Sequence, residues 1–255
     1  MNSRIPVYII NLERSLDRWE KAQASARQFA IDLRRINAVE GSKLSDDELK
    51  QFDDAAFRRN HGKIALPSEI GCYFSHVRAL EAIIAAPEPH AVIVEDDVVF
   101  TPEFKPLLEA LTRLRGWDVV KLVNHRWSGF RTFRRVNEHF AIGRCIHGPL
   151  GSAAAYVVTR EGAQRLLSAI RVMELPYDVA LERGWAGAYE IFTTDRPAVT
   201  FSKDMVSTIA HGRSAYARMR LVWYKRLSTL CFRAIDYVRR FAYAMKPGQL
   251  REVGD

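Results

Sequence analysis

Short apolar runs, most of them rich in β-branched residues, recur along the first two thirds of the chain. Runs that are apolar at every position are typical of strands buried on both faces of a sheet. Strands are therefore predicted at residues 7–10, 91–94, 117–123 and 152–159. A hairpin that turns at Asn137-Glu138 is predicted over residues 130–146. The β-branched run at 91–94 is the clearest strand of the set.

Apolar residues at helical spacing lie between these strands. Ser15 is a plausible N-cap for the first helix. Ser45 and Glu48 match a capping box at the start of the second helix. Helices are predicted at residues 15–30, from Ser45 onward, at 68–86, 102–114 and 161–170, and from Pro176 onward. Strands that alternate with helices predict an α/β fold with a doubly wound sheet. We expect one domain at residues 1–212, followed by an extension at 213–255.

The extension is strongly basic. It carries ten Lys/Arg against three Asp/Glu, which accounts for most of the net charge of +8. Apolar residues recur every three or four positions within 217–246, which predicts an amphipathic helix. Such a helix either lies on an anionic membrane surface or packs on the core with a solvated basic face, and the sequence favours neither. Nucleic-acid binding also fits the charge, but no recognisable motif supports it.

The overall composition is that of an ordinary globular protein, with 48% apolar and 27% charged residues. The three cysteines are odd in number and lack metal-finger spacing, which favours a reducing, intracellular setting. No run of about 18 apolar residues is present, so a membrane-spanning segment is not expected. The N-terminal apolar stretch is too short for a secretory signal. These features predict a cytoplasmic protein, either free or peripheral on the inner face of the membrane.

Glu95-Asp96-Asp97 directly follows the clearest predicted strand, and Val98-Val99-Phe100 comes next. Three consecutive carboxylates between apolar residues repel one another unless a positive charge neutralises them. Carboxylate oxygens suit Mn²⁺ or Mg²⁺, and the carboxyl ends of strands are where open α/β sheets bind ligands. On these residues alone, a metal site and a solvated acidic turn are equally good interpretations.

A second polar cluster, Asn11 to Arg18, follows the first predicted strand. Arg14 and Arg18 are four residues apart, so we expect them to share a helix face near its N-terminus. Guanidinium groups and a helix N-terminus together favour a phosphate. Taken alone, an ordinary surface helix of mixed charge is the better interpretation.

Three further segments carry polar groups of chemical interest. Ser75 and His76 lie in the middle of a predicted helix, where a histidine is more often a satisfied core residue than a catalyst; Cys72 has no activating neighbour in sequence and is expected to pack. Asp178 falls in the first turn of a predicted helix, where an interaction with the helix dipole is the simpler role. His211 lies in a loop-like segment, and a neutral imidazole there would be able to complete a distant metal site.

In sequence order, these segments resemble glycosyltransferase family 25, the lipooligosaccharide galactosyltransferase family that also includes collagen galactosyltransferases. The matching segments are residues 9–18, 69–76, 94–97, 151–158 and 176–178. Each is weak alone, and the ordered set is specific. The basic extension does not align with the family pattern.

The resemblance implies a GT-A-type fold with a Rossmann-like mixed sheet, a UDP-sugar donor, usually UDP-galactose, and inversion at the anomeric carbon. It places the donor at Asn11, Leu12, Arg14 and Arg18, and Mn²⁺ with the diphosphate at Glu95 and Asp97. We add Ser75, His76 and Asp96 to the donor-binding residues, and His211 as a third metal ligand. Asp178 matches the Pro-x-Asp segment and is the predicted catalytic base.

The acceptor implied by the resemblance is a glycan or a lipid-linked glycan. Two functions of other classes remain open on the sequence. A divalent-metal phosphohydrolase would use the same acidic cluster at a strand end to cleave a phosphate ester. A non-catalytic sugar-nucleotide or glycan-binding protein would keep the fold without needing a base.

Overall fold

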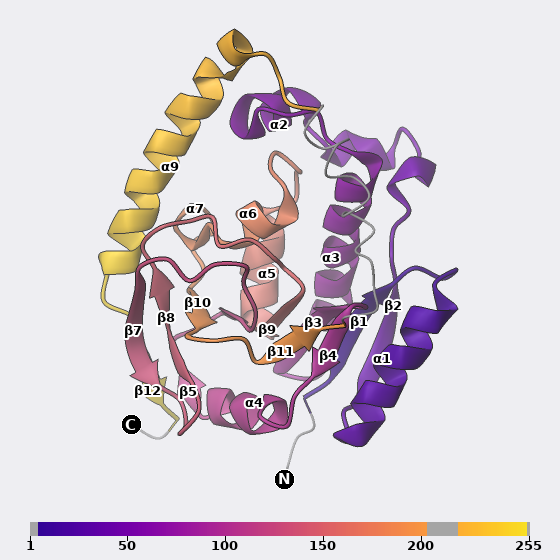
Figure 1. The fold of residues 1–255 in the computed structure, drawn as a ribbon, viewed down its shortest axis with the longest axis vertical. Coiled ribbons are helices and arrows are strands. Elements are labelled where there is room, and N and C mark those ends of the chain that lie inside the picture. Colours follow the sequence, from indigo (N-terminus) through magenta and orange to yellow (C-terminus); the bar gives the residue numbers. More distant parts are fainter. Residues whose placement is uncertain (1–4, 203–218, 254–255) are drawn as a thin grey trace.

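The computed structural model describes residues 5–202 and 219–253. In this part of the chain, eight strands form a mixed sheet with the order β2-β1-β3-β9-β6-β10-β8-β7 (Figure 1). The strands are β1 (Val7–Asn11), β2 (Leu33–Asn37), β3 (His90–Glu95), β6 (Val119–Lys121), β7 (Phe130–Arg135), β8 (Ala141–Cys145), β9 (Ala155–Thr159) and β10 (Ile191–Thr194). β1 is parallel to both β2 and β3, whereas β9 lies antiparallel between β3 and β6.

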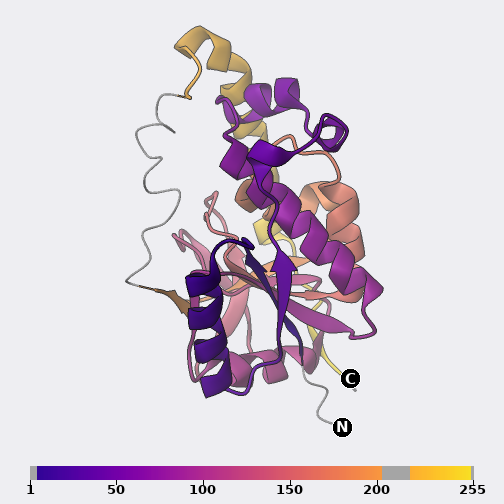
Figure 2. The same cartoon turned by 90° about the vertical axis from the view of Figure 1, so that its right-hand side faces the viewer.

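Helices cover both faces of this sheet. Val7 and Ile9 of β1 point to a core shared with α1 (Leu16–Gln28) and α4 (Phe104–Thr112). Tyr8 and Ile10 point to the opposite core, which is shared with α3 (Pro67–Ala85) and α5 (Arg160–Ala169). Figure 2 shows α1 and α3 on opposite sides of β1 and β2. The predicted α/β class, a mixed sheet flanked by helices, is confirmed.

Shorter elements complete the described structure. Two small antiparallel pairs join β4 (Val98–Phe100) to β11 (Val199–Phe201) and β5 (Leu114–Arg115) to β12 (Arg251–Glu252). The remaining α-helices are α2 (Asp54–His61), α6 (Tyr177–Leu181), α7 (Gly184–Gly187) and α9 (Leu227–Met245), and the 3₁₀ turns are η1 (Gly41–Lys43), η2 (Glu48–Gln51) and η4 (Trp223–Arg226). α9 packs against α2 and α7, and it forms one outer edge of the molecule in Figure 1.

Two of the helix predictions were wrong in their details. The Ser45–Glu48 capping bonds form, with the Ser45 amide donating to Glu48 Oε2 at 2.9 Å, but only the η2 turn follows. The α-helix begins at Asp54, where the Asp53 side chain accepts the amide of Ala56 at 2.8 Å. The apolar spacing within residues 16–30 also predicts that Leu16 belongs to the buried stripe of the first helix, but Leu16 is 56% exposed, whereas Ala22 and Ala26 are buried.

Among the described residues, no helix is both long enough and apolar enough to cross a membrane. The predicted domain boundary at 212/213 falls outside the described residues and stays a prediction.

Candidate active site

The acidic triplet lies where the sequence places it, at the carboxyl end of a central strand. β3 ends at Glu95, and Asp96 and Asp97 form the turn that leads into β4. Ile10 of the parallel strand β1 is in register with Glu95, so Asn11 at the end of β1 is brought beside the triplet. The strand alignment thus joins the two polar clusters, whose bonded residues are 78 to 85 positions apart in sequence.

Both carboxylate oxygens of Asp96 are held by the β1–α1 region. Asn11 Nδ2 donates to Asp96 Oδ2 at 2.7 Å, and Arg18 Nη1 donates to Asp96 Oδ1 at 2.9 Å. The Asn11 amide is oriented in turn by Arg35 of β2, which donates to Asn11 Oδ1 at 2.6 Å. Asp96 is therefore a structural link that positions the loop and is neutralised by Arg18.

Asp97 is in a different electrostatic situation. Its Oδ1 is buried and has no hydrogen-bond partner among the described residues. Burial, together with the charges of Glu95 and Asp96, raises the pKa of Asp97 to about 7. A buried carboxylate that lacks a hydrogen-bond donor is stabilised either by protonation or by binding a cation. Glu95 and Asp97 thus offer the carboxylate oxygens that Mn²⁺ or Mg²⁺ prefers as ligands.

Glu95 faces α3. Its Oε1 lies 3.4 Å from His76 Nε2 and 3.9 Å from Cys72 Sγ. His76, Cys72 and Glu95 together offer ligand atoms within 4.8 Å of one another. Burial and the neighbouring carboxylates raise the pKa of the Cys72 thiol, so it is neutral. The expectation that Cys72 is not activated agrees with this environment, but the sequence did not reveal its contact with Glu95.

His76 is both a satisfied core residue and a neighbour of the triplet. Its Nδ1 lies 3.1 Å from the Tyr156 hydroxyl, and that hydroxyl lies 2.7 Å from the hydroxyl of Tyr177. The His76 ring also stacks on Tyr177 with a centroid separation of 4.0 Å. This buried chain of polar groups connects Glu95 to the helix that carries Asp178.

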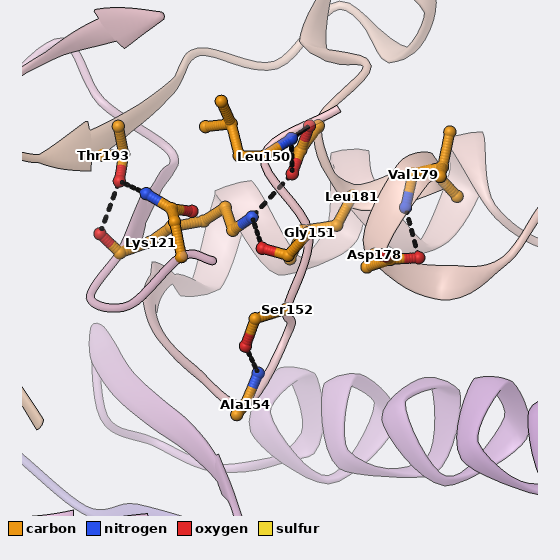
Figure 3. A network of polar contacts seen from close by, with 12 residues as sticks. Lys121, Leu150, Gly151, Ser152, Ala154, Asp178, Val179, Leu181 and Thr193 are labelled. Atoms are coloured by element: carbon orange, nitrogen blue, oxygen red, sulfur yellow. Dashed lines mark hydrogen bonds and ion pairs between the residues drawn. The ribbon is translucent and has the colours of Figure 1, made fainter. Parts of the chain in front are cut away.

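Asp178 lies in the first turn of α6, where the amide of Val179 donates to its Oδ1 at 2.9 Å (Figure 3). Burial and the negative charge of Glu182 raise its pKa. The charges of Glu95 and Asp178 both raise the pKa of Cys72, so both carboxylates lie near that thiol. The structure therefore brings the predicted base and Glu95, one of the predicted metal ligands, to one region.

A buried ionic network next to Asp178 was not predicted. Lys121 Nζ donates to Glu182 Oε1 at 2.7 Å and to the carbonyl of Gly151 at 3.1 Å (Figure 3). Glu182 also accepts the amide of Leu150 and pairs with Arg240 at 3.1 Å. Lys121 and Glu182 are almost fully buried, and their charges respectively lower and raise the pKa of Asp178. A lysine in the apolar strand 117–123 was the sequence signal for this network, because a buried ammonium group requires a partner.

The other residues that were predicted to bind the sugar nucleotide differ from one another in their surroundings. Arg14 precedes α1 and pairs with Glu40, so the expectation that Arg14 and Arg18 share a helix face was wrong. The Leu12 carbonyl accepts a bond from Arg35 at 3.1 Å. The Ser75 hydroxyl accepts the amide of Val39 and donates to the carbonyl of Gly71, which fixes α3 against the segment after β2. His211 lies outside the described residues, and its role as a metal ligand stays a prediction.

The sequence matches a family model described as glycosyltransferase family 25 (LPS biosynthesis protein) over residues 4–181. This segment contains the acidic triplet, Asn11, His76 and Asp178. It covers well over half of the chain, so the chain belongs to glycosyltransferase family 25.

Curated relatives agree with this assignment. A glycosyltransferase 25 family member from Aedes aegypti is 28% identical over 172 residues, which are 63% of this chain and 27% of that protein. Procollagen galactosyltransferase 2 from Mus musculus is 25% identical over 174 residues, covering 64% and 27%. A probable inactive family member 3 from Rattus norvegicus is 27% identical over 177 residues, covering 64% and 29%. The chain spans less than a third of the length of each of these relatives.

Proposed function

We propose that this chain is an active, inverting GT-A-type glycosyltransferase that moves a hexose from a UDP-sugar to a glycan hydroxyl. UDP-galactose is the proposed donor, because galactosyltransferases occur among the relatives. Lipooligosaccharide is the proposed acceptor, which agrees with the description of the family model. The observation that carries the proposal is the partnerless buried oxygen of Asp97, which lies beside Glu95 at the end of β3.

Glu95 and Asp97 would hold Mn²⁺ or Mg²⁺, with His211 as a further proposed ligand. When bound, the cation supplies positive charge to the diphosphate that leaves the sugar. Arg18 supports the same function, because it neutralises Asp96 and keeps the loop in place. Asn11, Leu12, Arg14, Ser75 and His76 complete the proposed donor-binding residues.

Asp178 is the proposed general base. An inverting transfer is a direct displacement in which the acceptor hydroxyl attacks the anomeric carbon as UDP leaves, so a carboxylate must accept the hydroxyl proton. A carboxylate of raised pKa holds that proton more strongly than an ordinary aspartate does, provided that it is ionised beforehand. The bond from Val179 fixes the orientation of the carboxylate.

A non-catalytic member of the family is the second candidate, since some relatives are named inactive. Such a protein would bind the sugar nucleotide without transferring the sugar. Asp178 and the acidic triplet favour the active form, because binding alone requires no base.

Replacing Asp97 with Ala is expected to abolish the metal-dependent part of UDP binding. The wild-type chain should bind UDP more tightly with Mn²⁺ than without it, by about tenfold or more, because Glu95 and Asp97 would hold a cation whose charge would attract the diphosphate. Isothermal titration calorimetry with and without Mn²⁺ measures this difference. Asp46→Ala, at an exposed position, is the matched control and should behave like wild type. An equal Mn²⁺ enhancement in the Asp97→Ala protein would show that Asp97 is not a ligand.

A further inference from the structure

Helix α9 exposes its apolar side. Along the helix the exposed large apolar residues recur every three to five positions, which places them on a single amphipathic face. They are Leu227, Leu230, Ile235, Val238, Phe241 and Met245, each between 45% and 65% exposed. Trp223 and Tyr224, in the η4 turn before the helix, are 75% and 56% exposed. Single exposed apolar residues are common on protein surfaces, but a contiguous patch of them indicates an interaction surface.

The side of α9 that faces the protein carries polar groups that bond to the rest of the molecule. Its buried residues are Thr229, Arg240 and Ala244. Thr229 donates to the carbonyl of Arg59 at 2.9 Å, and Arg240 pairs with the buried Glu182 at 3.1 Å. These bonds lie on the face of the helix opposite to Val238 and Leu227.

The inner face is fixed further by Asp236 and Tyr243. Asp236 pairs with Arg183 at 2.9 Å, and the Tyr243 hydroxyl accepts the amide of Ile191 at 2.9 Å. Turning the apolar side inward would leave the charges of Arg240 and Glu182 buried without partners, at a large free-energy cost. The outward orientation of the apolar side is therefore held by specific bonds.

The charges around the exposed face are positive. Arg239 and Lys246 are exposed beside it, with Lys246 also 3.7 Å from Glu190, and Arg226 is half-buried at its N-terminal end. Asp236 is the acidic residue of α9, and it is paired on the inner side. Of the two alternatives that the sequence leaves for this helix, α9 does pack against α2 and α7, but the face that it exposes is apolar as well as basic.

We propose that the outer face of η4 and α9, residues 223–246, docks on the surface of an anionic lipid bilayer as an interfacial helix. Aliphatic and aromatic residues would enter the boundary between headgroups and acyl chains, while Arg239 and Lys246 contact anionic headgroups. Trp223 and Tyr224 are of the residue types that favour this boundary. A second copy of the chain fits less well, because a symmetric contact would bring the basic flanks of two α9 helices together.

Membrane docking of α9 is independent of sugar transfer. Vesicle binding is measured without nucleotide, metal or acceptor, so its failure leaves the transfer proposal intact, and failure of transfer leaves the membrane proposal intact.

Co-sedimentation of the full chain with two kinds of vesicle tests the proposal. We expect binding to phosphatidylcholine vesicles that contain phosphatidylglycerol, and much weaker binding to phosphatidylcholine alone. The double variant Val238→Ser/Phe241→Ser should bind the anionic vesicles about tenfold more weakly, because less apolar area enters the bilayer. Val172→Ser, at a position 44% exposed elsewhere on the surface, is the matched control and should bind like wild type.

The contribution of charge is tested separately. Arg239→Gln/Lys246→Gln should weaken binding to anionic vesicles by roughly tenfold to thirtyfold, because each basic residue near the surface contributes about fivefold. Lys105→Gln, an exposed lysine on α4, should leave binding unchanged. Equal thermal unfolding midpoints of the variants and wild type show that the exposed substitutions preserve the fold.

Cys231, exposed on α9, provides a direct probe of insertion. A polarity-sensitive fluorophore attached to this residue should shift to shorter emission wavelength when anionic vesicles are added, and Cys231→Ser corrects for label on the other cysteines. The proposal is overturned if wild type does not bind anionic vesicles, or if Val238→Ser/Phe241→Ser binds them equally well. It is also overturned if the spectrum of the label is unchanged, or if the outer face instead forms a dimer that the same double variant dissociates.

Discussion

Replacing Asp178 with Asn is expected to lower kcat for sugar transfer by about 10²–10⁴-fold, the contribution typical of a positioned general base. Asn occupies nearly the same volume but cannot accept the proton of the acceptor hydroxyl. The affinity for UDP with Mn²⁺ should remain within a few-fold of wild type, because Asp178 is not among the proposed metal ligands. Steady-state kinetics combined with calorimetry separates the two effects.

The pH dependence of the wild-type enzyme provides a second test of the same residue. Because the pKa of Asp178 is raised by burial and by Glu182, the base becomes protonated at a higher pH than an ordinary aspartate would. Activity should therefore fall as the pH decreases through this raised pKa, which lies above 3.8. A kcat of Asp178→Asn close to that of wild type would show that the base lies elsewhere.

Replacing Glu182 with Ala is expected to produce the largest loss of stability, about 3–5 kcal/mol in the free energy of unfolding. The substitution would leave Lys121 and Arg240 buried without their carboxylate partner, and the amide of Leu150 without its acceptor. Urea unfolding followed by circular dichroism measures the change.

Glu138→Ala is the matched control for this experiment. The Glu138 side chain is 83% exposed and, within the part of the chain that the structure describes, its ion pair is with His139 on the surface, so its removal should change the unfolding free energy by less than about 1 kcal/mol. If the effect of Glu182→Ala were as small as that of the control, the network would not hold α9 and the loop at Gly151 in place.

The elements of the fold that could be predicted from the sequence were those with the most uniform patterns. Strand β3 was predicted because its residues form a continuous apolar run, and helix α3 because its apolar residues recur at helical spacing. Pro87 lies just after the end of this helix. Strand β2 was missed because Arg34 and Arg35 lie in its middle. Both arginines make bonds at the sheet edge, and these partners are supplied only by tertiary structure.

The candidate site was predicted in part for a similar reason. Glu95-Asp96-Asp97 stands out because carboxylates are rarely adjacent to a buried strand, whereas its pairing with Asn11 and Arg18 follows from the parallel register of β1 and β3. The contact of Cys72 and His76 with Glu95 depends on how α3 crosses the sheet. No local pattern in the sequence encodes such a crossing.

The structure also separates two roles within the triplet. Asp96 is neutralised by the protein itself through Arg18 and Asn11, whereas Asp97 has a buried oxygen that the described residues do not satisfy. The same three residues thus combine a structural link with a proposed cation ligand. A substitution at Asp96 should therefore change the conformation of the loop, whereas a substitution at Asp97 should weaken binding of the proposed cation.

The most direct test of the central claim is a donor screen with product detection, in which the chain is incubated with Mn²⁺ and individual UDP-sugars, with and without glycan acceptors. We expect an elongated glycan and stoichiometric UDP with one donor, UDP-galactose, only when the acceptor is present, and loss of this product in Asp178→Asn. Hydrolysis that is equally fast without acceptor would identify a phosphohydrolase and exclude a transferase. Binding of the donor without any product across the acceptors tested would contradict sugar transfer in favour of a non-catalytic family member.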